Sequence, residues 1–371
     1  MYDAIIRNGL IVDGTGKAAF SGDLAIKDGK IAAVGGVIGE AKEELDAAGL
    51  VVSPGFIDFH SHADMSILYD RFCSSRIYTG VTTDVIGNCG IGVAPISDDP
   101  QKAELLRAYL STRIVGTIPA PLEFHWKSFG EYLDYIDAHA PAINIAPLLS
   151  QGAIRIQEMG FSKEDATPEQ IIHMQQEVDK AMQEGALGLS SGLMYLPGAY
   201  TGTKELTELC KPMVPYGGMY VTHIRDYMDD LFPSVEEAIE IAENAGVPLH
   251  LSHFQIMTSK NSGKVQEILD VIEDARKRGV EVSLDTMPYD AGMTSLSALL
   301  PPWSMEGGVQ EFLKRIEKED VREKIIKDTL EGTPTWRSSY LAANDWEKVT
   351  IATVQTEKNR WAEGKTIAQA A

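Results

Sequence analysis

The stretch that most constrains this chain runs from Val51 to Asp64 and reads VVSPGFIDFHSHAD. A Pro-Gly turn precedes an apolar segment, Phe56 to Phe59, which leads into His60, Ser61 and His62. Side chains alternate along a strand, so His60 and His62 are expected on the same face. The alternative is a loop with two surface histidines. The turn and the apolar segment in front favour a metal site at the end of a strand.

After Gly55, short apolar segments alternate with longer helical stretches, which predicts a parallel sheet. The pattern favours a (β/α)8 barrel of about 250 residues. No Gly-rich phosphate loop follows the first strand, which argues against a doubly wound sheet. The predicted strands are Phe56–Phe59, Val81–Ile86, Ile143–Leu148, Leu187–Leu189, Met219–Thr222, Pro248–Ser252 and Val280–Asp285. The predicted helices are Pro168–Glu184, with Thr167 as its N-cap, Ser234–Ala245, ended by Gly246, and Val265–Arg278.

The two ends of the chain have sequence patterns that differ from the alternating pattern between them. Tyr2–Val12, Asp23–Ile26 and Lys30–Val34 predict a compact all-β start. Val349–Val354 is a connection or an accessory strand, followed by a helical-looking Lys365–Ala371. Nothing after Asp285 resembles a barrel strand that ends in a catalytic side chain, so the barrel is expected to lack its last unit.

Composition excludes several classes of partner. The 371 residues carry 33 Lys and Arg against 54 Asp and Glu, a formal charge of −21, which argues against nucleic acid and anionic membrane surfaces. Three cysteines argue against a disulfide framework and suit a reducing cytosol. No signal peptide is recognised, and no apolar run approaches the ~20 residues of a membrane span. We expect a cytoplasmic protein with a small-molecule substrate.

Metal-ligand residues gather at the predicted strand ends, where barrel active sites lie. Imidazole and thiolate are ligands that Zn²⁺ prefers, and an open coordination position makes a zinc site catalytic. The sequence therefore predicts a zinc site formed by His60, His62, Cys89, His223 and His253.

Other interpretations of these residues are open. Cys89 alone would more often be a small buried hydrophobe, and His223 alone could be a core histidine. His250 precedes His253 by three residues, so strand alternation predicts that it packs on the opposite face. Arg225 and Gln255 each follow a histidine by two residues. They either face the site or lie exposed at its rim.

These motifs resemble the amidohydrolase superfamily, and within it the N-acyl-D-amino-acid deacylases. PGFIDFHSHAD is similar to the first-strand metal motif. The other matching pieces are GVTTDVIGNCGIGVAP, GALGLSSGLMYLPGAY, VTHIRD, VPLHLSHFQ and DTMPYDAGMTSLSALLPPW, so the resemblance covers nearly the whole chain. It implies the N-terminal part of a small β-sandwich domain, residues 1–54, and a metal-dependent hydrolase barrel, residues 55–371, incomplete at its C-terminus.

The resemblance also implies roles for individual residues. Cys89, which replaces the bridging carbamylated lysine of many relatives, would hold zinc tightly with His223 and His253. His60 and His62 would form a second, weaker metal position. Tyr195, Tyr289 and Ser295 match positions that the family uses around the substrate.

Three departures from the family pattern bear on these expectations. A family lysine that would meet the substrate carboxylate is Gln255 here, and a Gly-His-Gly motif is Ser150-Gln151-Gly152. The family's catalytic aspartate on the eighth strand, with its substrate-binding arginine, has no match in this sequence. We therefore expect that the chain is truncated and that it is inactive when it ends at Ala371; the alternative is a natural protein that lost its base.

The expected chemistry is zinc-assisted hydrolysis of an N-acyl-D-amino acid to a D-amino acid and a carboxylate. A carboxylate would transfer protons, with Asp285 the nearest candidate here, and Tyr289 could donate a hydrogen bond to the oxyanion. One alternative is a cyclic amidase of the dihydroorotase or hydantoinase kind. Another is a non-catalytic barrel that serves as a binding module.

Overall fold

The computed structural model describes residues 1–111, 123–258, 260–333, 336, 346–354 and 356–371. The chain forms two compact units. The first comprises Met1–Ile57 and Tyr78–Thr82, and the second comprises Asp58–Ile77 and Thr83–Ala371. Within the described ranges, no helix is long and apolar enough to cross a lipid bilayer.

The first unit is built on a five-stranded mixed sheet in the order β3-β2-β1-β4, with β5 also paired to β1. The predicted turn at Asp28-Gly29 joins β2 to β3, and both residues have positive φ (51° and 69°), as a tight hairpin turn requires. The all-β start is thus confirmed, and the strands of residues 1–54 form one sheet. The strands are β1 (Tyr2–Ile11), β2 (Phe20–Lys27), β3 (Lys30–Val34), β4 (Ala41–Asp46) and β5 (Val51–Val52).

The remaining strands follow one another in chain order. They form a three-stranded sheet, β6-β7-β8, and a five-stranded sheet, β9-β10-β11-β12-β13. Only Leu148 separates β8 from β9, and its N–H donates to the Ile86 carbonyl at 2.9 Å. Pairing is parallel from β7 to β8 and throughout β9 to β13. The bounds are β6 (Phe56–Asp58), β7 (Val81–Ile86), β8 (Asn144–Pro147), β9 (Leu149–Ser150), β10 (Gly188–Gly192), β11 (Met219–His223), β12 (Leu249–Leu251) and β13 (Val282–Leu284).

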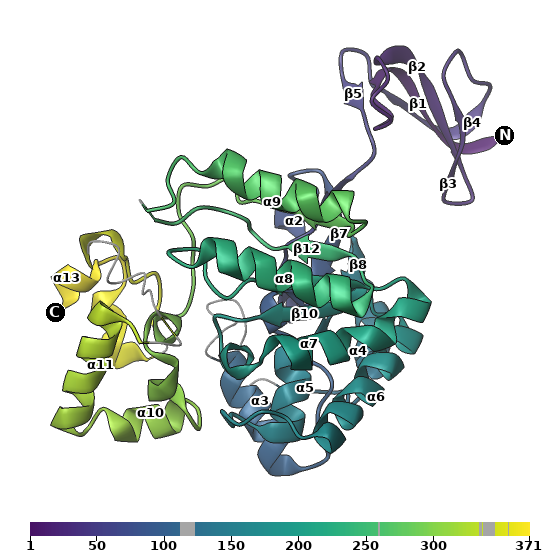
Figure 1. Cartoon of the computed structure of the whole chain (residues 1–371). Coiled ribbons are helices and arrows are strands. Elements are labelled where there is room, and N and C mark those ends of the chain that lie inside the picture. Colours follow the sequence, from purple (N-terminus) through teal and green to yellow (C-terminus); the bar gives the residue numbers. More distant parts are fainter. Residues whose placement is uncertain (112–122, 259, 334–335, 337–345, 355) are drawn as a thin grey trace. The chain divides into compact units, whose positions relative to one another are not determined.

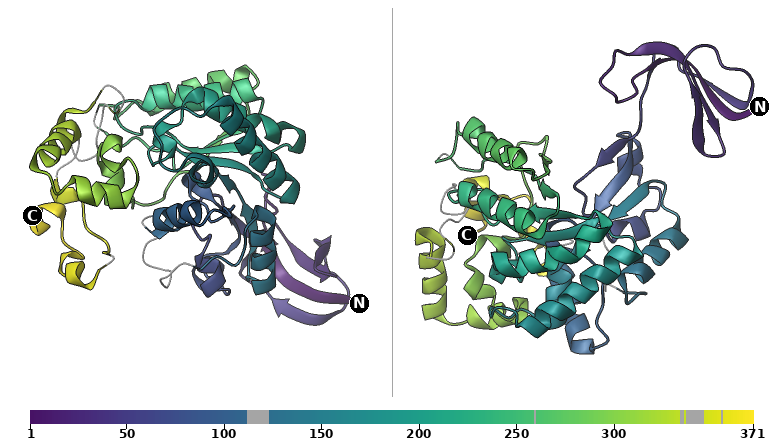
Figure 2. Two further views of the ribbon diagram at one scale, coloured as in Figure 1. Left: turned by 90° about the horizontal axis from the view of Figure 1, so that it is seen from below. Right: turned by 45° about the vertical axis from the view of Figure 1, so that its right-hand side comes forward.

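All seven predicted strands are therefore present, with β8 inside the predicted third strand and β9 directly after it, and the fold is mixed α/β. Helices separate most of the strands (Figures 1 and 2). They are α1 (Ser66–Tyr69), α2 (Ser74–Ile77), α3 (Pro100–Ser111), α4 (Phe129–His139), α5 (Gln151–Met159), α6 (Pro168–Glu184), α7 (Thr203–Cys210), α8 (Leu231–Ala245), α9 (Val265–Lys277), α10 (Val309–Arg315), α11 (Glu319–Glu331) and α13 (Ile367–Ala370).

The helix signals read from the sequence are largely confirmed. Helix α6 has the predicted bounds, and Thr167 caps it in a capping box with Gln170. Helix α8 ends at Gly246 as predicted but begins three residues earlier, at Leu231. By contrast, Val349–Val354 is not an accessory strand: among the described residues it forms one isolated bridge, between Thr350 and Thr366.

The parallel strands bury both faces, as expected when helices cover a sheet. Their outward residues, such as Tyr220 and Leu249, join the large cluster that packs against the helices. Their other face carries a smaller cluster of Val85, Leu148 and Val221. The strand ends at which the sequence predicts ligands belong to this second unit.

A buried ion pair links α5 to α7. Arg155 is fully buried, and its Nε donates to Glu205 Oε1 at 3.1 Å, while its terminal nitrogens donate to the carbonyls of Ser162 and Glu164. The pair therefore fixes helices that pack close to the strand ends.

We predict that Arg155→Leu lowers the free energy of unfolding by about 3–5 kcal/mol, because it leaves the Glu205 carboxylate buried without its partner. Urea unfolding followed by circular dichroism measures this. Arg278→Leu is the control, since Arg278 pairs with Glu243 where both side chains are exposed to water. Equal losses in the two variants would contradict the prediction.

Candidate metal centre

A tight turn after β7 carries Cys89. The turn is a short 3₁₀ segment, Asn88–Gly90, in which Cys89 has a left-handed backbone with φ of 57°. Gly87 has φ of 81°, and a Cβ there would lie 2.2 Å from the Leu148 carbonyl oxygen. Buried Ser190 closes the turn, since its hydroxyl accepts from the Gly90 N–H and donates to the Gly87 carbonyl. The GNCG sequence therefore specifies the backbone that presents the thiol.

The four predicted histidine ligands converge on this thiol. Cys89 Sγ lies 3.2 Å from His60 Nε2 and 3.5 Å from His253 Nε2. Two groups of residues each have their ligand atoms within 4.8 Å of one another. The first group is Cys89, His223 and His253, and the second group is Cys89, His60 and His62. The His223 and His253 rings are 4.5 Å apart, and those of His60 and His253 are 4.7 Å apart. Cys89 is thus common to both groups.

The first group has the features of a metal site. His223 is buried, and neither of its ring nitrogens has a hydrogen-bond partner within the described part of the chain. A buried imidazole without partners is costly, and a metal ion would satisfy its lone pair. One thiolate and two imidazoles also match the ligand set of zinc enzymes that keep an open position. These residues therefore fit a zinc ion.

The histidines and the thiol change one another's pKa. Burial alone would raise the pKa of the Cys89 thiol, but the imidazoles of His60, His253 and His62 lower it well below its usual value. Burial, together with His253, lowers the pKa of His223 to about 4, so this ring is neutral at pH 7. A thiolate beside a neutral imidazole is the state in which both bind a metal.

Asp285 directly follows β13 and lies on the Nδ1 side of the His60 ring, away from Cys89. Its Oδ2 is 3.3 Å from His60 Nδ1 and 2.8 Å from His250 Nε2, and its Oδ1 accepts the His253 backbone N–H at 2.6 Å. Burial would raise its pKa, but hydrogen bonds from His250 and His60 lower it strongly. One carboxylate thus contacts three histidines at the ends of β6 and β12.

The prediction that His250 only packs, on the face opposite to the site, is wrong in part. His250 pairs in register with Val221 of the smaller cluster, and its ring packs on Phe59 at 4.1 Å. It packs as predicted, but it also reaches Asp285. The alternation argument failed because His253 lies beyond the end of β12 with φ of 34°, which breaks the two-residue period.

Tyr227 was not singled out from the sequence. Its hydroxyl accepts the Ile224 N–H at 3.1 Å and donates to the Ser252 carbonyl at 2.9 Å. Its ring lies against both His223 and His253. It therefore ties the ends of β11 and β12 together beside the first ligand group, and no motif pointed to it.

The residues predicted around the substrate are spread more widely than the predicted metal ligands. The Tyr195 ring packs on His223 at 4.7 Å, and its hydroxyl is 3.2 Å from Thr294 Oγ1, next to Ser295. Tyr289 is 76% exposed, and Gln255 is partly buried.

Arg225 is engaged within the protein. Its guanidinium binds Glu237 and donates to the carbonyls of Ala199 and Thr201. It therefore braces the end of β11 against α8 and the loop after β10. The structure thus brings Tyr195 to the histidines and ties Arg225 to other parts of the chain.

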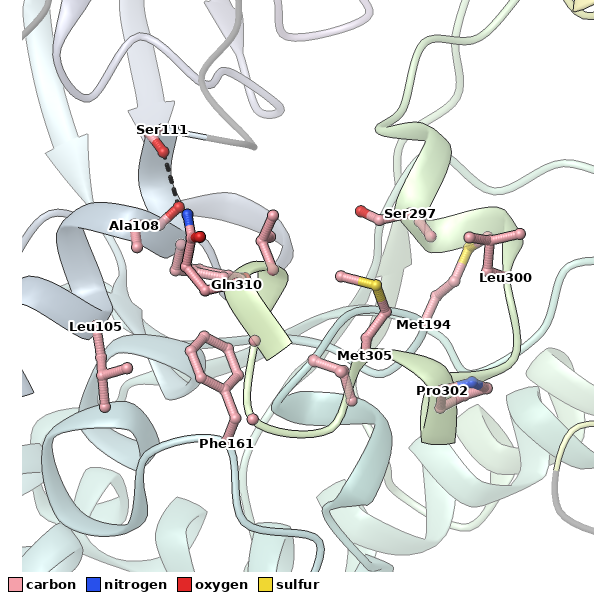
Figure 3. A pocket seen from close by; sticks show the side chains of 16 residues that line it. Leu105, Ala108, Ser111, Phe161, Met194, Ser297, Leu300, Pro302, Met305 and Gln310 are labelled. Carbon is pink, nitrogen blue, oxygen red and sulfur yellow. Dashed lines mark hydrogen bonds between the residues drawn. The ribbon is translucent and has the colours of Figure 1, made fainter. Parts of the chain in front are cut away.

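A separate cavity of about 200 Å³ lies beside the segment that carries Tyr195. Figure 3 shows its mainly apolar lining, with Met194 and Met305 opposite Leu105 and Phe161. Met194 directly precedes Tyr195, so this cavity and the histidine cluster share one segment of chain.

The comparisons with known proteins agree with this geometry. Residues 43–321 match the family described as the amidohydrolase family. The match covers most of the sequence, and the chain belongs to this family.

Individual relatives show which members of the family this chain is similar to. The chain is 35% identical over 303 residues to a D-aminoacylase of Alcaligenes xylosoxydans xylosoxydans, a match that covers 80% of this chain and 59% of that protein. A crystal structure of D-aminoacylase, described as defining a novel subset of amidohydrolases, is 33% identical with a TM-score of 0.71, covering 88% of this chain and 70% of that one. An N-acyl-D-glutamate deacylase from Bordetella bronchiseptica, solved with zinc and a phosphonate mimic of the tetrahedral intermediate, is 33% identical with a TM-score of 0.69, covering 78% and 59%.

We predict that, without metal, Cys89 alone of the three cysteines is a thiolate at pH 7. Burial raises the pKa of both Cys73 and Cys210, in contrast to the lowered pKa of Cys89. Ultraviolet absorbance should report one thiolate per chain that persists below the ordinary Cys pKa of about 8.5. Cys89→Ser should abolish this signal, whereas Cys210→Ala should keep it. A thiolate signal that appears only above pH 8.5 would contradict the prediction.

Proposed function

We propose that this protein is a zinc-dependent deacylase that hydrolyses the amide bond of N-acyl-D-amino acids to a D-amino acid and a carboxylate. The observation that carries the proposal is that one cysteine sulfur, that of Cys89, is shared by two histidine groups at the strand ends. Membership of the amidohydrolase family and the likeness to D-aminoacylase support the reaction class and the substrate class.

Cys89, His223 and His253 would hold one zinc ion, and His60 and His62 with Cys89 would hold a second. The N-acyl-D-glutamate deacylase structure contains zinc, and a D-aminoacylase structure is described with a binuclear metal centre, which supports this assignment. When bound, zinc supplies Lewis-acid polarisation of a carbonyl and lowers the pKa of a water molecule toward about 7.

The protein's own side chains would orient the substrate. Tyr195 packs on His223, and Tyr289 and Ser295 lie on the segment after β13 whose Thr294 meets the Tyr195 hydroxyl. We propose that the Tyr289 hydroxyl donates to the oxygen of the scissile carbonyl as negative charge develops there. Gln255 would offer an amide where the resemblance implies a lysine, so the substrate carboxylate would be held by hydrogen bonds without that cation.

We further propose that β6 to β13 are strands of a (β/α)8 barrel, residues 55–371, and that residues 1–54 form the small N-terminal domain. The strand order follows the chain order, as in such a barrel, and the strands of the first sheet all end by Val52. A cytoplasmic location with a small-molecule substrate completes the proposal.

The proposal predicts that the zinc-loaded protein, produced from its complete reading frame, releases free D-amino acid from N-acetyl-D-amino acids. Chelation of zinc should abolish the activity, and added zinc should restore it. Cys89→Ala should lower kcat/KM by a factor on the order of 10³ or more, because both ligand groups lose their common ligand. Cys210→Ala, which changes a thiol buried in the core, serves as the control.

Two assays measure this: amino-acid release, and zinc content after dialysis. A Cys89→Ala variant that kept both its zinc and its activity would contradict the proposal. Ring opening of a hydantoin, without release of amino acid from N-acyl substrates, would instead point to a cyclic amidase.

A further inference from the structure

We propose that Asp285 and His250 are positioning residues for the second metal group, with His250 acting on His60 through the Asp285 carboxylate. The inference rests on the proposed function, because it concerns the metal groups of that same site. Neither residue belongs to the two ligand groups themselves.

The two ring nitrogens of His60 have different neighbours, and this decides which of them can bind a metal. His60 Nδ1 lies 3.3 Å from Asp285 Oδ2, and His60 Nε2 lies 3.2 Å from Cys89 Sγ. With Nδ1–H donating to the carboxylate, the lone pair of Nε2 points toward the shared thiol. A carboxylate behind an imidazole selects the tautomer and fixes the ring in this way.

His250 holds the Asp285 carboxylate in place. His250 Nε2 lies 2.8 Å from the same Oδ2, and its Nδ1 lies 2.8 Å from Ser283 Oγ. Its side chain is 4% exposed and packs on Phe59, so its orientation is fixed from three directions. Since Nε2 is engaged with Asp285, His250 acts on the metal through that carboxylate and not as a ligand.

The two metal groups differ in the contacts that orient their histidines. His223 has no hydrogen-bond partner among the described residues, so the first group receives no orienting contact of this kind through that ring. His253 is linked to Asp285 only through its backbone N–H, which holds the left-handed residue in place. Removing His250 should therefore affect the second group selectively, whereas changing Asp285 should affect both.

The test is a zinc titration of the purified protein against a competing chelator. The unmodified protein should bind two zinc ions with different affinities. His250→Leu should keep the tighter ion and weaken the second by about 10–100-fold, the usual effect of losing an outer hydrogen bond to a ligand. His250→Gln, whose amide can still donate to Asp285, should recover most of that loss.

Two further variants sharpen the test. His173→Leu is the matched control, because His173 also lies 3.3 Å from a carboxylate, that of Glu158, but on the exposed surface. It should leave both affinities unchanged. Asp285→Asn should weaken both zinc ions, since it alters the contacts to His60 and to the His253 backbone together.

Circular dichroism melting compares the folded fraction of the variants. If His250→Leu melts early, the comparison of His250→Gln with the unmodified protein decides: equal affinity for the second ion supports the inference, and a loss as large as that of His250→Leu overturns it. Equal second affinity in folded His250→Leu also overturns it. A protein that binds one zinc ion, through Cys89, His223 and His253, overturns this inference and leaves the proposed function standing, whereas one that binds none overturns both.

Discussion

The contact on which this site depends is the one between the Cys89 thiolate and the imidazoles around it. The thiol is buried, and an isolated thiolate there would be costly, yet His60, His253 and His62 lower its pKa well below the ordinary value. The backbone has to place that sulfur accurately. The left-handed turn, closed by Ser190 and packed against the Leu148 carbonyl, does this without any contribution from the ligands themselves.

The layer around the ligands shows how a parallel sheet builds such a site. Tyr227 joins the ends of β11 and β12, and Asp285 joins the ends of β6, β12 and β13. Each uses one polar group to fix two or more strand ends at once. Chain segments that are far apart in sequence are thereby held at ligand distances, which is what allows one sulfur to serve two groups of histidines.

Sequence reasoning identified the residues that converge on Cys89, because parallel strands bring their carboxyl ends to one edge and residues after neighbouring strands therefore meet. It could not find contacts that depend on where a strand stops. His250 was assigned by counting from His253, but the positive φ of His253 breaks the alternation on which the count relies. Arg225 was expected either to face the site or to lie exposed at its rim, whereas it binds Glu237 on helix α8, which spacing along β11 does not reveal. A strand pattern likewise does not specify how the strands of residues 1–54 are ordered within their sheet.

The central claim is that one cysteine thiolate is a zinc ligand together with histidines. Zinc X-ray absorption spectroscopy of the loaded protein tests this most directly, because sulfur and nitrogen ligands differ in bond length, about 2.3 Å against about 2.0–2.1 Å. The account predicts sulfur in the zinc coordination shell, and its loss in Cys89→Ala. A shell of nitrogen and oxygen alone in the unmodified protein would contradict it.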